Sequence, residues 1–425
     1  MPLSPVDAAW LRMDSPENAM VITTVLRFGA PLDEAAFTDA LSKLLEHRRF
    51  RMRVVHHRRA LTGAAWELDP DFDLASHVRR VRLPPPGDDA TLLAFVSARM
   101  STPLDRTRPL WQLDIVDGVG EGSALLVRIH HAVGDGVALV RLLLGVTSAS
   151  PENAPVEVGL PPAPRILGAR ALLARGRSQA ETLARLLLLP GDASTSLRGA
   201  LGVRKVAAFS KPFPVATVKA LARAHGGHVN DLLAAAVAGA LRAHLPEPRR
   251  VRALVPVFLS GLGREEGNHF GLAYLSLPVD RADRAERIRE ARRAMDELKS
   301  QPDAAVAFAV LGAMGLASPR LERFGIGLFT RKATLLMTNV PGPTGRVQLA
   351  GEDVTSMVVW APTSGSIGVG FSLLTYAGEL RLGVAADAHR VSDPAALVAC
   401  FEDELDAMAR DAGLTTEQRT AGAPL

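Results

Sequence analysis

The chain has 425 residues, of which 48% are hydrophobic and 22% charged, so it is long and apolar enough to fold into two or more globular domains. Its formal net charge is +4, and most of its basic residues are arginines that are spread along the chain between acidic residues. A nucleic-acid-binding protein would concentrate its basic residues, so we expect no nucleic-acid partner. The single cysteine, Cys400, excludes an intramolecular disulfide and fits a reducing cytoplasm.

The chain shows no sequence feature that would export it or carry it through a membrane. Its first residues include Asp7, Asp14 and Glu17 and no basic stretch followed by an apolar run, so we expect no signal peptide. The longest uncharged apolar run, residues 304–317, is shorter than the ~18 to 20 residues that a membrane span requires. We therefore expect a cytoplasmic protein that is either soluble or bound at a membrane surface.

Residues 1–150 alternate helix and strand patterns, which predicts an α/β half. Helices are expected at 33–47 and 88–100, and strands at 51–56, 113–116 and 124–129.

Residues 151–205 have a different composition and predict a linker. A proline-rich crossover at 149–164 precedes residues 165–189, where arginines alternate with many leucines. This pattern fits a basic amphipathic helix on a membrane surface or a linker helix buried against both halves.

Residues 206–425 again mix helices and strands and predict a second α/β half. The last two expected strands are joined by residues 377–379 as a hairpin. The expected helices are 214–224, 229–244, 282–299 and 393–408, and the expected strands are 251–258, 333–339, 368–376 and 380–386.

The most informative motif is HHAVGDG, which contains His130, His131, Asp135 and Gly136. The two histidines end a predicted strand, and the Asp-Gly pair opens the next predicted helix. Histidine is well suited to moving a proton near neutral pH. Taken singly, Asp135 fits a helix cap, Gly136 a turn glycine and each histidine a core residue. We expect no metal, because no Cys-x-x-Cys or His-Glu-x-x-His set accompanies the pair.

These seven residues resemble the active-site motif of the bacterial wax ester synthase/diacylglycerol acyltransferase family, within the chloramphenicol-acetyltransferase-like superfamily of CoA-dependent acyltransferases. Further similar segments follow in the same order, so the resemblance spans nearly the whole chain. They lie at 3–21, 103–111, 229–231, 255–257, 267–268 and 338–343. The resemblance implies an α/β fold of two chloramphenicol-acetyltransferase-like domains, each a mixed sheet flanked by helices, with the active-site channel between them.

The resemblance also implies the reaction. An acyl-CoA would donate a long acyl chain to a fatty alcohol or diacylglycerol, giving wax ester or triacylglycerol by direct transfer. His131 would be the general base, His130 a supporting residue and Gly136 a point of close backbone approach. Asp135 would hold the loop through an arginine such as Arg128 or Arg141. Acyl-CoA is a substrate here, so no cofactor is expected, and the absence of a Gly-x-Ser-x-Gly elbow disfavours a covalent serine route.

Other residues of the similar segments have a structural interpretation beside the functional one. They shape or support the channel, or they are core residues, a helix cap and turns: Pro109, Leu110, Trp111, Asn230, Asp231, Asn339, Ser364 and Ser366. Two other functions also stay open at this point. One is a related CoA-dependent acyltransferase with a different acceptor, and the other is a non-catalytic lipid-binding protein of the same fold.

Overall fold

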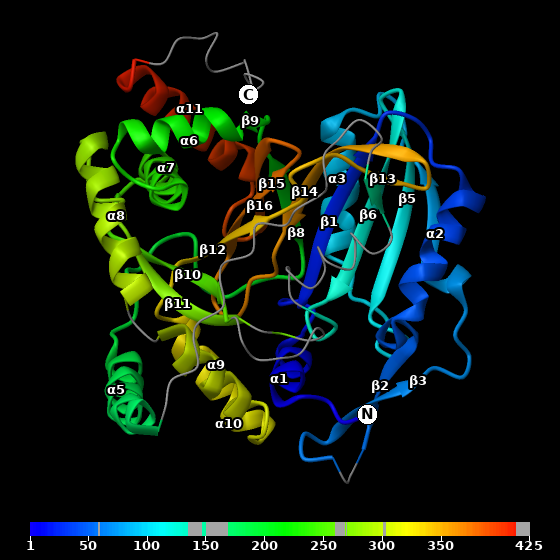
Figure 1. The fold of residues 1–425 in the computed structure, drawn as a ribbon, viewed down its shortest axis with the longest axis horizontal. Helices are drawn as coiled ribbons and strands as arrows, with labels where there is room; N and C mark the ends of the chain where they lie inside the picture. Colours follow the sequence, from blue (N-terminus) through cyan, green and yellow to red (C-terminus); the bar gives the residue numbers. More distant parts are fainter. Residues whose placement is uncertain are drawn as a thin grey trace.

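The computed structural model describes residues 1–57, 60–134, 147–149, 169–259, 268, 270–300 and 303–413. Its described strands form two large sheets and one small hairpin (Figure 1). The predicted fold of two mixed sheets flanked by helices is confirmed.

The first sheet belongs mainly to the N-terminal half. It runs in the order β4 (Val78–Arg82), β5 (Trp111–Val119), β6 (Gly122–His130), β1 (Val21–Phe28), β14 (Glu352–Trp360), β13 (Val347–Leu349) and β7 (Ser148–Ala149). Because side chains alternate along a strand, β1 divides its apolar residues between two cores. Ile22 and Leu26 pack with α2 (Glu34–Glu46), whereas Val25 packs on the opposite face with α3 (Asp89–Met100).

The remaining elements of this half lie at its edges. The helix α1 (Pro5–Met13) precedes β1 and is capped by the Ser4 side chain, which accepts a hydrogen bond from the Asp7 amide. The chain also forms η1 (Arg48–Arg51), the hairpin β2 (Met52–His56) and β3 (Ala64–Leu68), and η2 (Leu74–Ser76).

The second sheet lies in the C-terminal half. Its order is β11 (Phe270–Leu277), β10 (Val251–Phe258), β12 (Leu335–Pro341), β15 (Val369–Tyr376), β16 (Glu379–Asp387) and β8 (Lys205–Phe209), and β9 (Phe213–Pro214) also pairs with β16. One face of this sheet is covered by the helices α6 (Val215–Ala224), α7 (Val229–His244), α8 (Arg284–Ser300) and α11 (Pro394–Asp411). The helices α9 (Asp303–Met314) and α10 (Pro319–Thr330) lie below the sheet in the view of Figure 1.

The helix α7 is the centre of the C-terminal core. Residues 231–241 are all buried, and most of them are alanines and leucines. Small side chains let α11 approach closely, since a Cβ atom on Gly239 would lie 2.5 Å from the Glu404 side chain. Burial on every side explains why this helix lacks a polar face.

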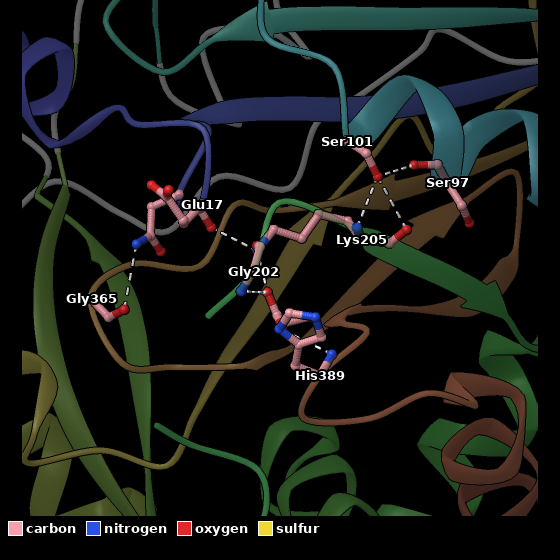
Figure 2. A network of polar contacts seen from close by, with 9 residues as sticks. Glu17, Ser97, Ser101, Gly202, Lys205, Gly365 and His389 are labelled. Atoms are coloured by element: carbon pink, nitrogen blue, oxygen red, sulfur yellow. Dashed lines mark hydrogen bonds and ion pairs between the residues drawn. The ribbon is translucent and has the colours of Figure 1, made fainter. Parts of the chain in front are cut away.

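Two features join the halves. The strand β14 crosses from the C-terminal part of the sequence and pairs with β1 along residues 354–360, so the sheets do not follow the expected division at 1–150, 151–205 and 206–425. The helix α3 lies against β8. There the Ser101 hydroxyl accepts a hydrogen bond from the Lys205 amide at 2.8 Å (Figure 2), and the Ser97 hydroxyl accepts one from the Ala207 amide at 3.0 Å.

The Lys205 ammonium completes this junction. It bonds the carboxylate of Asp387 on β16 and the carbonyl oxygen of Glu17 before β1, each at 2.7 Å (Figure 2). A lysine side chain that is only 12% exposed needs such partners to offset the partial loss of its hydration. The network therefore fixes β8 and β16 against the N-terminal half.

The linker contains α5 (Ala169–Leu188), in agreement with the predicted helix at 165–189. Near its end, Thr182 and Leu186 are buried, and Arg185 forms an ion pair with Asp303 of α9. This part of α5 is therefore packed against the C-terminal half. None of the described helices is long and apolar enough to cross a membrane.

Candidate active site

The histidine pair lies where β6 leaves the first sheet. The amide of His130 donates to the carbonyl of Leu110 at 2.9 Å, and the amide of His131 donates to the carbonyl of Met20 at 2.7 Å. Both side chains are buried. Backbone hydrogen bonds from β5 and from the start of β1 therefore fix the position of the pair.

His130 is held in a tautomer that cannot act as a base toward a substrate. Its Nδ1 accepts a hydrogen bond from the Ala132 amide at 3.0 Å, so a neutral ring carries its proton on Nε2. That nitrogen faces the Asp14 carboxylate at 3.8 Å. Burial lowers the pKa of His130 to about 4, against the opposing effect of Asp14. His130 is therefore neutral near pH 7 and supports the loop.

His131 is held in the opposite tautomer by Asn268. Its Nδ1 lies 2.9 Å from the Asn268 side-chain oxygen. The Asn268 amide nitrogen donates to Asp7 Oδ1 and to the His131 carbonyl, both at 2.8 Å. Both of these partners are acceptors, so the amide cannot be turned around without losing them. Nδ1 of His131 must therefore be the donor, and in the neutral ring Nε2 carries the lone pair.

The network around His131 comes from three distant parts of the sequence. Trp10 of α1 stacks on the imidazole with ring centroids 4.3 Å apart, and Phe270 at the start of β11 lies 5.2 Å away. Asp7, also on α1, pairs with Arg49 at 3.4 Å. Stacking and hydrogen bonding together fix both the plane and the tautomer of the ring.

Two apolar cavities lie near the histidine pair along the chain. The β6 cavity, of about 120 Å³, is lined by Leu125, Val127 and Ile129, which share one face of β6 and end two residues before His131. The β11 cavity, of about 60 Å³, is lined by Leu272 and Tyr274, which share a face of β11 with Phe270. It is also lined by Met13, one helical turn beyond Trp10. The linings of both cavities are mainly apolar side chains, which is the chemistry of lipid-chain pockets.

The predicted residues on the motif loop are only partly described. Asp135, Gly136 and Arg141 lie outside the described residues, so their expected roles stay predictions. Arg128 is buried and donates to the side-chain oxygen of Gln112 at 3.1 Å and to the carbonyl of Thr102. Desolvation lowers the pKa of this guanidinium to about 10.

The Pro-Leu-Trp segment has mixed roles in the structure. Trp111 lines the β6 cavity, and its indole nitrogen donates to the Phe50 carbonyl at 2.8 Å. Leu110 holds the His130 amide through its carbonyl. Pro109 instead lines a separate polar pocket, of about 420 Å³, together with His77 and Arg108.

Asn230 and Asn339 bind each other rather than the histidine loop. The Asn339 amide donates to the Asn230 side-chain oxygen at 2.7 Å on the exposed surface. Asp231 is buried, and its carboxylate accepts from the His228 amide at 2.7 Å, which caps α7. The structure therefore gives Asp231 the helix-cap role that was predicted for Asn230 and Asp231 together, whereas Asn230 binds Asn339 instead.

The two serines of the turn between β14 and β15 have different surroundings. Ser364 lines the β11 cavity. Ser366 accepts a weak hydrogen bond from Arg198 at 3.5 Å, and its carbonyl accepts from the Gly199 amide. Only Ser364 is therefore placed to contact a ligand of that cavity.

Sequence reasoning noticed Asn268 only as part of a motif and gave Asp7 and Trp10 no role. The one local signal was Asp7, an acid in the first turn of a mainly apolar helix, and the structure shows that it is buried. Within the described residues no group of His, Cys, Asp or Glu side chains is arranged to hold a metal ion.

His131 of the first half and Asn268 of the second are hydrogen-bonded where two mixed α/β halves meet, the arrangement that the sequence resemblance to two-domain acyltransferases implies. The model of the wax ester synthase/diacylglycerol acyltransferase catalytic domain matches residues 3–208, and the model of the C-terminal domain of the same family matches residues 266–409. The chain belongs to this family of acyltransferases.

Relatives and solved structures agree with this assignment. The chain is 27% identical to the probable diacylglycerol O-acyltransferase Tgs1 of Mycobacterium tuberculosis, with 94% of each chain covered. It is 28% identical to Tgs2 of the same species, with 97% of this chain and 99% of that one covered.

The fold matches the wax ester synthase/diacylglycerol acyltransferase of Marinobacter aquaeolei VT8 with a TM-score of 0.73 at 22% identity, covering 97% of this chain and 100% of that one. It also matches the starter condensation domain of rhizomide synthetase in complex with C8-CoA and Leu-SNAC, with a TM-score of 0.61 at 16% identity, covering 97% and 94%.

Proposed function

We propose that this acyltransferase moves a long acyl chain from acyl-CoA directly to the hydroxyl of a fatty alcohol or diacylglycerol, with His131 as the general base. The observation that carries the proposal is the tautomer of His131, whose Nδ1 faces the Asn268 side-chain oxygen so that Nε2 is the basic nitrogen. The products would be wax ester or triacylglycerol.

The reaction follows from that geometry. A lipid hydroxyl ionises too weakly near pH 7 to attack by itself, so Nε2 takes its proton as the oxygen bonds to the thioester carbonyl. The tetrahedral intermediate then collapses and breaks the carbon–sulfur bond. The departing CoA sulfur takes the proton from the imidazolium, which restores neutral His131 and leaves no acyl-enzyme.

The two cavities supply one place for each lipid chain. We assign the acyl chain to the β6 cavity, because it is the larger of the two and its lining ends two residues before His131, and the acceptor chain to the β11 cavity. Burial of apolar surface contributes ~0.8 kcal/mol per methylene, so a long chain gains most of its binding free energy there.

The relatives support the choice of substrates. Two mycobacterial relatives are named diacylglycerol O-acyltransferases, which favours a lipid alcohol as acceptor. A condensation domain of the same fold is described in complex with C8-CoA, which favours an acyl-CoA as donor.

The test is CoA release from palmitoyl-CoA by the purified full chain, with and without hexadecanol or dipalmitoylglycerol. We expect release that depends on the acceptor and is lost in His131→Ala but retained in His56→Ala, a control at an exposed histidine. Substrate variation should give ternary-complex kinetics.

Three results would contradict the proposal. A folded, fully active His131→Ala protein would remove His131 as the base, and a trapped acyl-enzyme would exclude direct transfer. CoA release only with amines or other acceptors would favour a related CoA-dependent acyltransferase with a different acceptor. No CoA release from folded protein would favour a non-catalytic lipid-binding protein of the same fold.

A further inference from the structure

The α9–α10 hairpin, residues 303–331, exposes large apolar side chains. Leu316 is 52% exposed, Leu321 60% and Phe324 65%. Ala305, Ala309 and Ala313, spaced four residues apart on α9, are also exposed. Single exposed apolar residues are ordinary, but a group of them on adjacent helices marks a surface for an apolar partner.

The exposed charged side chains of this hairpin are all basic. Arg320, Arg323 and Arg331 are exposed, whereas Asp303 and Glu322 are buried. The structure describes residues 303–331 completely, and within them no acid is exposed. Apolar side chains beside unopposed arginines complement a surface that is anionic outside and apolar within, which is the chemistry of an anionic phospholipid layer.

The same hairpin covers the β11 cavity. Val310 and Met314 of α9 and Ile326 and Phe329 of α10 line that cavity from the side of the hairpin. The exposed apolar surface and an apolar cavity therefore belong to the same two helices.

The hairpin is also fixed to the helix that holds His131. Arg12 of α1 donates to the Ala317 and Met314 carbonyls at 3.0 and 3.3 Å and to the Gly315 carbonyl, and it pairs with Glu322 of α10 at 2.7 Å. The helix α1 carries Asp7 and Trp10, which position the imidazole. A surface that bound the hairpin would therefore hold the β11 cavity and the imidazole in a fixed orientation to itself.

We propose that the α9–α10 hairpin docks on anionic phospholipid surfaces and that the acceptor reaches the β11 cavity from the lipid layer at this point. The second clause rests on the proposed function, which places the acceptor in that cavity. The hairpin, rather than the packed end of α5, is then the membrane-binding element.

The test is co-sedimentation of the full chain with phosphatidylcholine vesicles, with and without 30 mol% phosphatidylglycerol. We expect wild-type protein to bind the anionic vesicles and Leu321→Ser/Phe324→Ser to bind them at least tenfold more weakly. Arg320→Glu/Arg323→Glu should lose the preference for anionic vesicles. The matched controls are Leu61→Ser/Leu68→Ser and Arg48→Glu/Arg223→Glu, which change exposed leucines and arginines elsewhere and should leave binding unchanged.

A second measurement separates docking from catalysis. With palmitoyl-CoA and hexanol in the absence of vesicles, the hairpin variants should match the wild type, whereas their rate with vesicle-borne diacylglycerol should fall with vesicle binding. If the wild type did not react with hexanol, that result would contradict the proposed function rather than the docking proposal.

Equal vesicle binding by the hairpin and control variants would overturn the docking proposal. So would a change from dimer to monomer in the hairpin variants without weaker vesicle binding, because the surface would then be an interface between copies of the chain.

Discussion

Replacing Asn268 by alanine tests whether this residue makes Nε2 the basic nitrogen of His131. The variant removes the acceptor for His131 Nδ1–H and the donor to Asp7 and to the His131 carbonyl. Losing a hydrogen-bond partner in a buried site costs ~1 to 3 kcal/mol. If that loss falls on the reactive tautomer, kcat should decrease by about 5- to 150-fold, at 1.4 kcal/mol for each factor of ten.

The assay is steady-state CoA release over a range of palmitoyl-CoA and hexanol concentrations. Because Asn268 orients the base and contacts neither apolar cavity lining, kcat should fall while both KM values stay within about threefold. Asp7→Asn should give a smaller loss of kcat. It replaces the carboxylate that only accepts hydrogen bonds and so fixes the orientation of the Asn268 amide, but Asn268 itself remains.

Asn18→Ala is the matched control. Asn18 follows α1 and donates to the Gly365 carbonyl at 3.4 Å, so its loss should not alter the tautomer of His131. An Asn268→Ala protein with wild-type kcat and wild-type urea stability would refute the orientation of the amide and, with it, the assigned base. A loss confined to KM would make Asn268 a binding residue.

Three further predictions concern stability and selectivity. Burial raises the pKa of Glu322 from 4.5 to about 7, so stability that is complete below pH 4.5 should decline as the pH rises to about 7, at up to ~1.36 kcal/mol per pH unit. In urea unfolding at several pH values, Glu322→Gln should make the free energy of unfolding depend less on pH between 4.5 and about 7. An unchanged pH dependence would contradict this prediction. Val127→Phe should shorten the β6 cavity, lowering kcat/KM about tenfold for palmitoyl-CoA but not for octanoyl-CoA; equal losses would place the acyl chain elsewhere. Asp231→Asn should weaken the α7 cap by ~1 kcal/mol in urea unfolding, and a large fall in kcat of the folded protein would instead give Asp231 a part in the reaction.

Much of the site could be located from local sequence patterns. The apolar run before His130 predicts a strand that ends at the pair, and β6 does end at His130. The alternation of side chains along that strand also places Leu125, Val127 and Ile129 on one face. Both properties depend on neighbouring residues alone, so they are readable without the fold. The motif itself led to the family, which the matches over residues 3–208 and 266–409 confirm.

The difference between the two histidines could not be found in this way. His130 takes its tautomer from the nearby Ala132 amide, but His131 takes it from Asn268, 137 residues away, and Asn268 is oriented by Asp7, 261 residues away. Likewise, no local pattern shows that β14 pairs with β1 or that Arg12 joins α1 to α10.

The sequence by itself determined the periodic elements, the histidine pair at a strand end and the acyltransferase family. Only the tertiary structure decided which imidazole nitrogen is basic and which residues line the two apolar cavities. The physical reason is that strand and helix periodicity acts over a few residues, whereas a hydrogen-bond network is set by groups that chain packing brings together from distant positions.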